Sequence, residues 1–168
     1  MEVRLLRLVR VGEEDFSEYI RTIRKLDHSI NPTNEIRVSK EYVDKIIQAN
    51  RNTVFDKSVF IDNMKDPNIE AYFLKDNEDK IIGIVFIKFE EKMAFIVDFG
   101  ILSQYKGHGI GTAFFNMVLN KSIVARQCKL ITLRCPFFGA QIFWQKLGFK
   151  IVVDKEYYIG NPLMKKRL

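Results

Sequence analysis

A glycine-rich stretch from Tyr105 to Thr112 lies between an apolar run and a run with helical spacing. The apolar run, Met93–Ile101, predicts a buried strand, and the spacing after the glycines predicts a helix. The apolar stripe of that helix consists of Phe114, Phe115, Val118 and Leu119. Three glycines at alternate positions remove Cβ atoms from the turn, so unpaired N–H groups at the helix start can approach an anion. The pattern predicts a strand-to-helix turn that holds a diphosphate.

Two common phosphate loops do not fit this stretch. A Walker loop needs a lysine between the last glycine and the hydroxyl residue, and Gly111 is followed directly by Thr112. A dinucleotide-binding turn has the pattern Gly-x-Gly-x-x-Gly and an acidic residue about 20 positions further on. Neither pattern is present, so the loop belongs to another class of phosphate site.

The stretch resembles motif A of the GNAT family of acyl-CoA N-acyltransferases, Arg/Gln-x-x-Gly-x-Gly/Ala. Two registers are possible, Gln104-x-x-Gly107-x-Gly109 and Lys106-x-x-Gly109-x-Gly111. We prefer the second, because members of the family commonly read Tyr-Arg-Gly-x-Gly-Ile-Gly. This register places a lysine where the family usually has arginine or glutamine, and a lysine can still meet phosphate as a point charge.

A second stretch, Ala140 to Phe149, looks like motif B of the same family, often Ala-x-x-Leu-Tyr-x-Lys-x-Gly-Phe. Its apolar residues recur at i, i+3, i+4 and i+7, which predicts a short helix capped by Gly148. They are Ala140, Phe143, Trp144 and Leu147. An ordinary amphipathic helix would also explain this pattern. The two motifs follow one another in the order and spacing of the family.

The remaining pattern predicts the order β-α-α-β-β-β-α-β-α-β-β, which matches the GNAT fold. We expect an α/β (α+β) fold with a mixed, mostly antiparallel central sheet of about seven strands and helices on both faces. The expected strands are 3–9, 69–74, 81–89, 93–101, 130–133, 149–153 and 163–168. The expected helices of this order are 13–26, 39–50, 110–125 and 140–147, and a shorter helix at about 59–64 is expected in addition.

Composition limits the remaining classes. A length of 168 residues predicts a single domain, 1–168, with a sizeable core. No apolar run is long enough to span a membrane, and the N-terminus lacks a signal-peptide pattern. Cys128 and Cys135 form no disulfide framework, and we expect no metal site and a cytoplasmic location. The net charge of +6 suits a polyanionic cofactor, and because the basic residues are dispersed we do not expect nucleic-acid binding.

The resemblance implies an N-acetyltransferase that moves an acetyl group from acetyl-CoA to a primary amine, by direct attack in a ternary complex. The acceptor, a small-molecule amine or a peptide N-terminus, is not identified, and a monomer or homodimer is expected. The alternative is a non-catalytic acyl-CoA-binding sensor. Two departures from the family motivate it: Trp144 stands where many members have tyrosine, and Phe137 stands where asparagine is frequent.

The resemblance also implies which residues hold CoA. The diphosphate is expected at Lys106, Gly107, His108, Gly109, Ile110, Gly111 and Thr112, and the thioester at Phe99, Gly100 and Ile101. There a backbone N–H can polarise the thioester carbonyl, and the pantetheine arm can pair with the strand edge. Gly100 inside an apolar strand suggests a β-bulge or a close backbone approach, although tight packing would also explain it.

Proton transfer needs a base and an acid. Asp98 is the only carboxylate in the apolar strand and is our candidate base, although it could instead pair with a neighbouring cation or amide. His108 is less favoured, because its place in the loop directs it toward cofactor or solvent. An indole cannot supply the proton. The candidate acids are therefore Cys135 and Tyr157, with Tyr158 beside it, and water is a further source.

Overall fold

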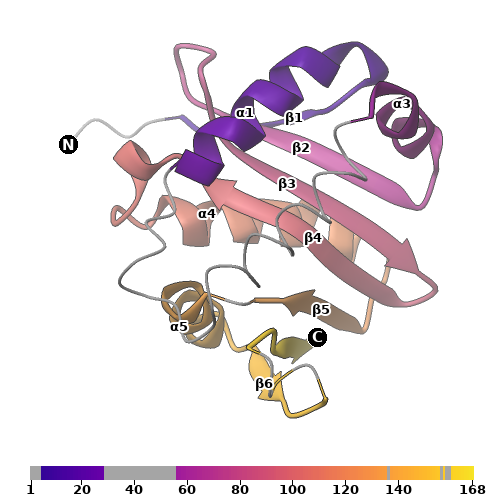
Figure 1. The fold of residues 1–168 in the computed structure, drawn as a ribbon, viewed down its shortest axis with the longest axis vertical. Coiled ribbons are helices and arrows are strands. Elements are labelled where there is room, and N and C mark those ends of the chain that lie inside the picture. Colours follow the sequence, from indigo (N-terminus) through magenta and orange to yellow (C-terminus); the bar gives the residue numbers. More distant parts are fainter. Residues whose placement is uncertain (1–4, 29–55, 136, 156, 158–159) are drawn as a thin grey trace.

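The computed structural model describes residues 5–28, 56–135, 137–155, 157 and 160–168. Its helices and strands are β1 (Arg7–Arg10), α1 (Phe16–His28), α3 (Lys57–Lys65), β2 (Ile69–Lys75), β3 (Ile81–Glu90), β4 (Met93–Ile101), α4 (Ile110–Val118), β5 (Leu130–Arg134), α5 (Phe138–Lys146), β6 (Lys150–Val152) and β7 (Leu163–Arg167). The helix predicted over 39–50 lies outside the described residues. The order of the other elements is the predicted one, with ends that differ by a few residues (Figure 1).

In this part of the chain, seven strands form one sheet in the order β1-β2-β3-β4-β5-β7-β6. The β4–β5 pair is parallel, whereas the other neighbouring pairs are antiparallel. A parallel pair requires a crossover, which α4 supplies between β4 and β5. The expectation of a mixed, mostly antiparallel sheet is therefore confirmed.

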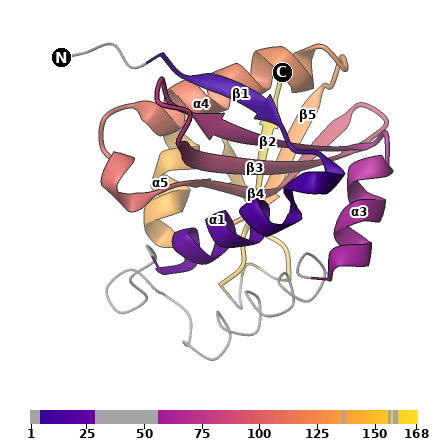
Figure 2. The ribbon, with the colours of Figure 1, turned by 90° about the horizontal axis from the view of Figure 1, so that it is seen from above.

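Helices cover both faces of the sheet, and each face has its own apolar core. Phe114 and Phe115 of α4 and Trp144 of α5 belong to one core. Tyr19 of α1 and Phe60 of α3 belong to the other. Figure 2 shows α1 and α3 on the opposite side of the sheet from α4. The helix predicted to run from 110 to 125 changes to a π-helix at Leu119–Val124.

Strand β4 carries a β-bulge in its middle. Ile96 pairs with Ile87 of β3 and Asp98 pairs with Phe86, so Val97 has no cross-strand partner on β3. Val97 packs against the core under α1, and Phe86 belongs to the same core. Because strand residues alternate between faces, a regular β4 would place Asp98 with Ile96 on the α4 side. The extra residue reverses the alternation and turns Asp98 toward α1.

The parallel pairing of β4 with β5 stops before β4 ends. The last paired residues are Ile96 and Leu133, whereas β4 continues to Ile101. In the described part of the chain, the segment from Val97 to Ile101 therefore pairs with β3 alone. Among the described strands none pairs with the side of this segment that faces away from β3, and we call this side the free edge of β4; it lies directly before the glycine-rich loop. No helix in the described residues is long and apolar enough to cross a membrane.

Candidate active site

The glycine-rich loop presents the start of α4 to solvent. Gly107 and Gly109 have positive φ values of 81° and 74°, and Gly109 is the N-cap of α4. The first backbone hydrogen bond of the helix runs from the Ala113 N–H to the Gly109 carbonyl, 3.0 Å. The N–H groups of the first three helical residues precede this bond, so the helix itself cannot satisfy them. A Cβ added to Gly107 or Gly109 would meet no atom within 4 Å, so space for an anion lies before these groups.

The other loop residues fall into two groups. Lys106, His108 and Thr112 are exposed, and Ile110 is half-buried against the core under α4. Gly111 serves packing, because a Cβ there would lie 3.2 Å from the Phe143 ring of α5. Two of the three alternating glycines thus shape the loop, and the third lets α4 approach α5.

The free edge of β4 holds the residues predicted to contact the thioester. Phe99 stacks on Phe114, with ring centroids 4.8 Å apart, and Ile101 is buried. At Gly100 an added Cβ would lie 2.8 Å from the Leu26 side chain of α1. Of the explanations offered for Gly100, the β-bulge is wrong, because the bulge lies at Val97. Tight packing is confirmed by the contact with Leu26, and the Gly100 carbonyl also lies close to Gly83 of β3.

Asp98, the predicted base, lies half-buried on the α1 side of the sheet. The pKa of Tyr19 is raised well above its usual value, first because the hydroxyl is buried and then because the Asp98 carboxylate is close and acts as an acceptor for it. The contact lacks the geometry of a normal hydrogen bond. Asp98 is thus held near α1, at the start of the free edge of β4.

Of the candidate acids, Cys135 lies directly after β5 and Tyr157 lies between β6 and β7. Burial raises the pKa of the Cys135 thiol to about 11, against an opposing effect of the Phe137 backbone. The thiol lies 3.6 Å from the Phe137 carbonyl oxygen, to which it donates. Since an ordinary thiol has a pKa near 8.5, Cys135 is a weaker acid than the CoA thiol that its proton would form. Tyr157 is 39% exposed, and its N–H donates to the Asp154 carbonyl, 3.1 Å. Tyr158 lies outside the described residues.

Trp144 occupies the position where many relatives have tyrosine, and it is a packing residue here. Its side chain is 5% exposed. It contacts four aromatic rings at centroid distances from 5.0 to 5.6 Å: Phe99, Phe115, Phe143 and Phe149. The indole therefore joins β4, α4, α5 and the residue before β6, and it stabilises the free edge from the α4 side.

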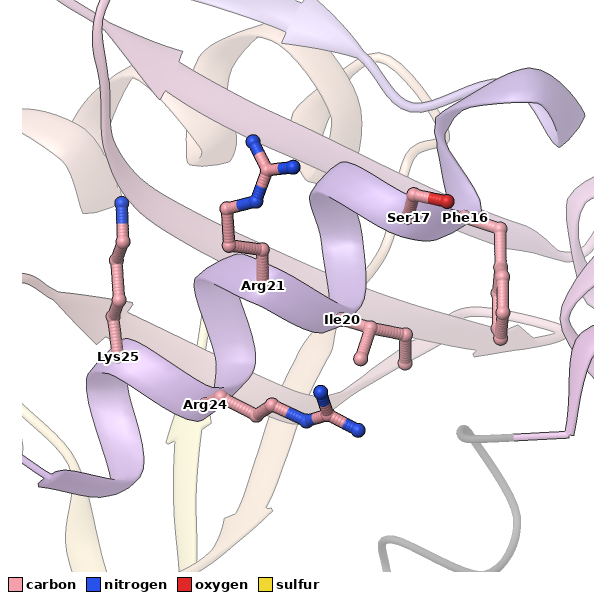
Figure 3. A pocket seen from close by; sticks show the side chains of 6 residues that line it. All are labelled: Phe16, Ser17, Ile20, Arg21, Arg24 and Lys25. Carbon is pink, nitrogen blue, oxygen red and sulfur yellow. The ribbon is translucent and has the colours of Figure 1, made fainter.

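A cavity of about 440 Å³ lies along the outer surface of α1. Its described lining is Phe16, Ser17, Ile20, Arg21, Arg24 and Lys25 (Figure 3). Arg21 pairs with Glu18 at 2.9 Å, whereas neither Arg24 nor Lys25 has an ion pair within the described ranges. The surface of α1 therefore carries more positive than negative charge beside this cavity.

Sequence reasoning missed two features of the site. The pattern predicted a helix over 13–26, which contains Tyr19, but gave no sign that the Tyr19 hydroxyl comes close to Asp98, 79 positions later. Likewise, Gly83 of β3 packs against the Gly100 carbonyl, 2.8 Å from an added Cβ. The one signal in the sequence for this close approach is Gly83 itself, a glycine in an otherwise apolar strand. No cluster of three His, Cys, Asp or Glu that could hold a metal occurs where the structure describes the chain.

Comparison with known proteins agrees with this geometry. The sequence model described as "Acetyltransferase (GNAT) family" matches residues 33–149. The chain belongs to the GNAT family. A search of curated protein sequences found no match.

Solved GNAT structures share the fold over almost the full chain. The PaiA N-acetyltransferase of Thermoplasma acidophilum, in complex with coenzyme A, has a TM-score of 0.77 at 16% identity and covers 98% of this chain and 99% of its own. An acetyltransferase of Thermus thermophilus has a TM-score of 0.68 at 18% identity, with 100% of both chains covered. The F149G mutant of the spermidine N-acetyltransferase SpeG from Vibrio cholerae has a TM-score of 0.64 at 17% identity, covering 96% and 93%. At these identities the likeness concerns the fold.

Proposed function

We propose that this GNAT protein is an acetyl-CoA-dependent N-acetyltransferase that acts on a primary amine. The observation that carries the proposal is the free edge of β4, which leads directly into the unsatisfied N-terminus of α4. An extended thioester arm can pair with such an edge while its diphosphate meets the helix N-terminus. The CoA complex of a protein with the same fold supports this assignment of the cosubstrate.

In this proposal the loop from Lys106 to Thr112 binds the diphosphate of CoA. The backbone near Gly100 polarises the thioester carbonyl, and the amine attacks the carbonyl carbon. A C–N bond forms and the C–S bond breaks. Asp98 accepts the proton that the amine loses, and water protonates the departing thiolate, because the raised pKa of Cys135 makes this thiol a poor donor.

For the acceptor we propose a primary amine without several positive charges. If the acceptor lies along α1, Arg24 and Lys25 would repel a polycation such as the substrate named for the spermidine acetyltransferase relative. A test panel should therefore contain spermidine, neutral amines and amines that carry a carboxylate. The two free cysteines, Cys128 and Cys135, support the further proposal of a reducing, cytoplasmic setting.

The experiment is to incubate the protein with acetyl-CoA and each amine and to follow the release of free thiol. We expect turnover with at least one amine. Asp98→Asn should lower kcat by roughly 100-fold or more, the usual contribution of a general base, with little change in the KM for acetyl-CoA. Glu90→Gln is the matched control, because Glu90 is exposed at the far end of β3.

The competing function is a non-catalytic acyl-CoA sensor. It is favoured by Trp144, whose buried indole replaces the usual phenol of the family. Thiol release separates the two functions. Tight CoA binding without turnover on any amine of the panel would establish the sensor and overturn the enzyme proposal.

A further inference from the structure

Tyr19 carries a buried hydroxyl that the packing of the protein does not explain. The residue is 0% exposed, and its ring lies 5.1 Å from the ring of Phe60 and 6.4 Å from that of Phe86. The hydroxyl has no hydrogen-bond partner of normal geometry in the described residues. A phenylalanine would keep the ring contacts without burying an unsatisfied polar atom, which is costly. The hydroxyl therefore needs a role beyond packing.

Asp98 is the charged group that this hydroxyl meets. Phe86 is the cross-strand neighbour of Asp98 on the same face, and Tyr19 packs against the Phe86 ring. The bulge at Val97 puts Asp98 on this face. Burial and the nearby carboxylate together raise the pKa of Tyr19.

The other described elements around Tyr19 present apolar side chains. Helix α3 contributes Phe60, and β3 contributes Ile84 and Phe86 to the core that contains Tyr19. Asp98 is the ionisable group that acts on Tyr19 among the described residues. The Tyr19 phenol thus lies in apolar surroundings and close to the half-buried carboxylate of Asp98.

We propose that Tyr19 is a positioning residue for Asp98. This rests on the proposed function, in which Asp98 is the base. With the substrates bound, the Tyr19 hydroxyl donates to the Asp98 carboxylate and so fixes the orientation in which Asp98 takes the proton of the acceptor amine. Catalytic hydrogen bonds are often long in the free enzyme and tighten only when the substrates are bound, which agrees with the imperfect contact in the free protein.

Two matched variants separate positioning from packing. Tyr19→Phe removes an unsatisfied hydroxyl, so we expect an equal or higher Tm. Tyr72→Phe removes a buried hydroxyl that donates to Glu70 at 2.8 Å, in the core on the other face of the sheet, so we expect a lower Tm. If Tyr19 had a purely structural role, Tyr19→Phe would change the Tm at most and would leave kcat and KM unchanged.

The positioning role predicts a kinetic effect of Tyr19→Phe. We expect kcat to fall about tenfold, a small part of the usual contribution of a general base, at an unchanged KM for acetyl-CoA. Loss of the donor leaves the ionised carboxylate less stabilised in the enzyme–substrate complex, so the acidic limb of the kcat profile moves to higher pH. Tyr72→Phe should leave that limb in place.

A measurement without turnover tests the same inference. Carbon-13 NMR follows the titration of the Asp98 carboxyl, identified by its absence in Asp98→Asn, in the wild type and in Tyr19→Phe with CoA present. We expect the titration to move to higher pH in Tyr19→Phe. An unchanged titration would overturn the positioning role. Failure of the proposed function would instead show as an absence of thiol release by the wild type with every amine.

Discussion

The side chain of Leu26 occupies the space where Gly100 would carry a Cβ, with its Cδ1 atom 2.8 Å from that position. Helix α1 thus lies directly against the free edge segment of β4. Gly100 is also close to β3, because a Cβ built on Gly83 would lie 2.8 Å from the Gly100 carbonyl oxygen. The segment proposed to hold the thioester is therefore packed between α1 and β3, and glycine at both positions makes this possible.

Alanine at these two glycines should have unequal effects. In Gly83→Ala the new methyl meets a backbone oxygen that cannot turn away, so we expect a loss of about 1 to 3 kcal/mol in the free energy of unfolding. In Gly100→Ala the tip of Leu26 can rotate, so the loss should be smaller. Urea unfolding measures both. Leu26→Ala should remove most of the effect of Gly100→Ala but none of that of Gly83→Ala, and equal losses in the two single variants would contradict this packing.

Cys135 should make the protein less stable at alkaline pH. Its pKa in the folded protein is raised from 9.0 to about 11. The contribution of the protonated thiol to the free energy of unfolding is therefore complete below pH 9 and is lost as the pH rises through 11. At 1.36 kcal/mol per pKa unit the loss is roughly 3 kcal/mol. The difference in unfolding free energy between wild type and Cys135→Ala should be constant below pH 9 and narrow above it. A difference independent of pH up to 11 would show that the thiol is not desolvated.

Glu70 should stabilise the protein most at neutral pH. Burial opposes its ionisation, but hydrogen bonds from Ser122, Tyr72 and Arg126 outweigh that effect and lower its pKa below 4.5. Its contribution is therefore present above pH 4.5 and lost as the pH falls through the lower folded value. Glu70→Gln should cost about 3 kcal/mol at pH 7.

The pH dependence is the specific signature of this network. The gap in unfolding free energy between wild type and Glu70→Gln should close as the pH is lowered below 4.5. Glu78→Gln is the control, because Glu78 forms an exposed pair with Lys80 and should change stability little at any pH. A constant gap between pH 7 and pH 3 would mean that the carboxylate charge of Glu70 is not what stabilises the fold.

Local pattern predicted much of this fold because the relevant signals are short. The strand Met93–Ile101 appears with the predicted bounds, since its apolar run ends in turn residues on both sides. The start of α4 follows from the glycines, and Gly148 ends α5 with a φ of 89°, as the motif indicates. These features depend on neighbours within one or two turns of the chain.

The unpredicted features depend on contacts between distant segments. The bulge at Val97 arises from the register between β3 and β4, and no residue type in the sequence predicts it. That extra residue determines which face of the sheet Asp98 occupies, and it therefore brings the Asp98 carboxylate close to Tyr19. The same limit applies to the acceptor, because the basic side chains along the described surface of α1 come together only in the folded helix.

The central claim, that the start of α4 binds the diphosphate of CoA, is tested most directly by calorimetric titration of acetyl-CoA into two variants. Gly109→Glu places a carboxylate at the N-cap of α4, whereas Asn116→Glu adds the same charge to an exposed position further along the helix. Both variants should first be shown to unfold cooperatively. We predict that Gly109→Glu abolishes binding and that Asn116→Glu binds like the wild type. Wild-type affinity in folded Gly109→Glu would contradict the account.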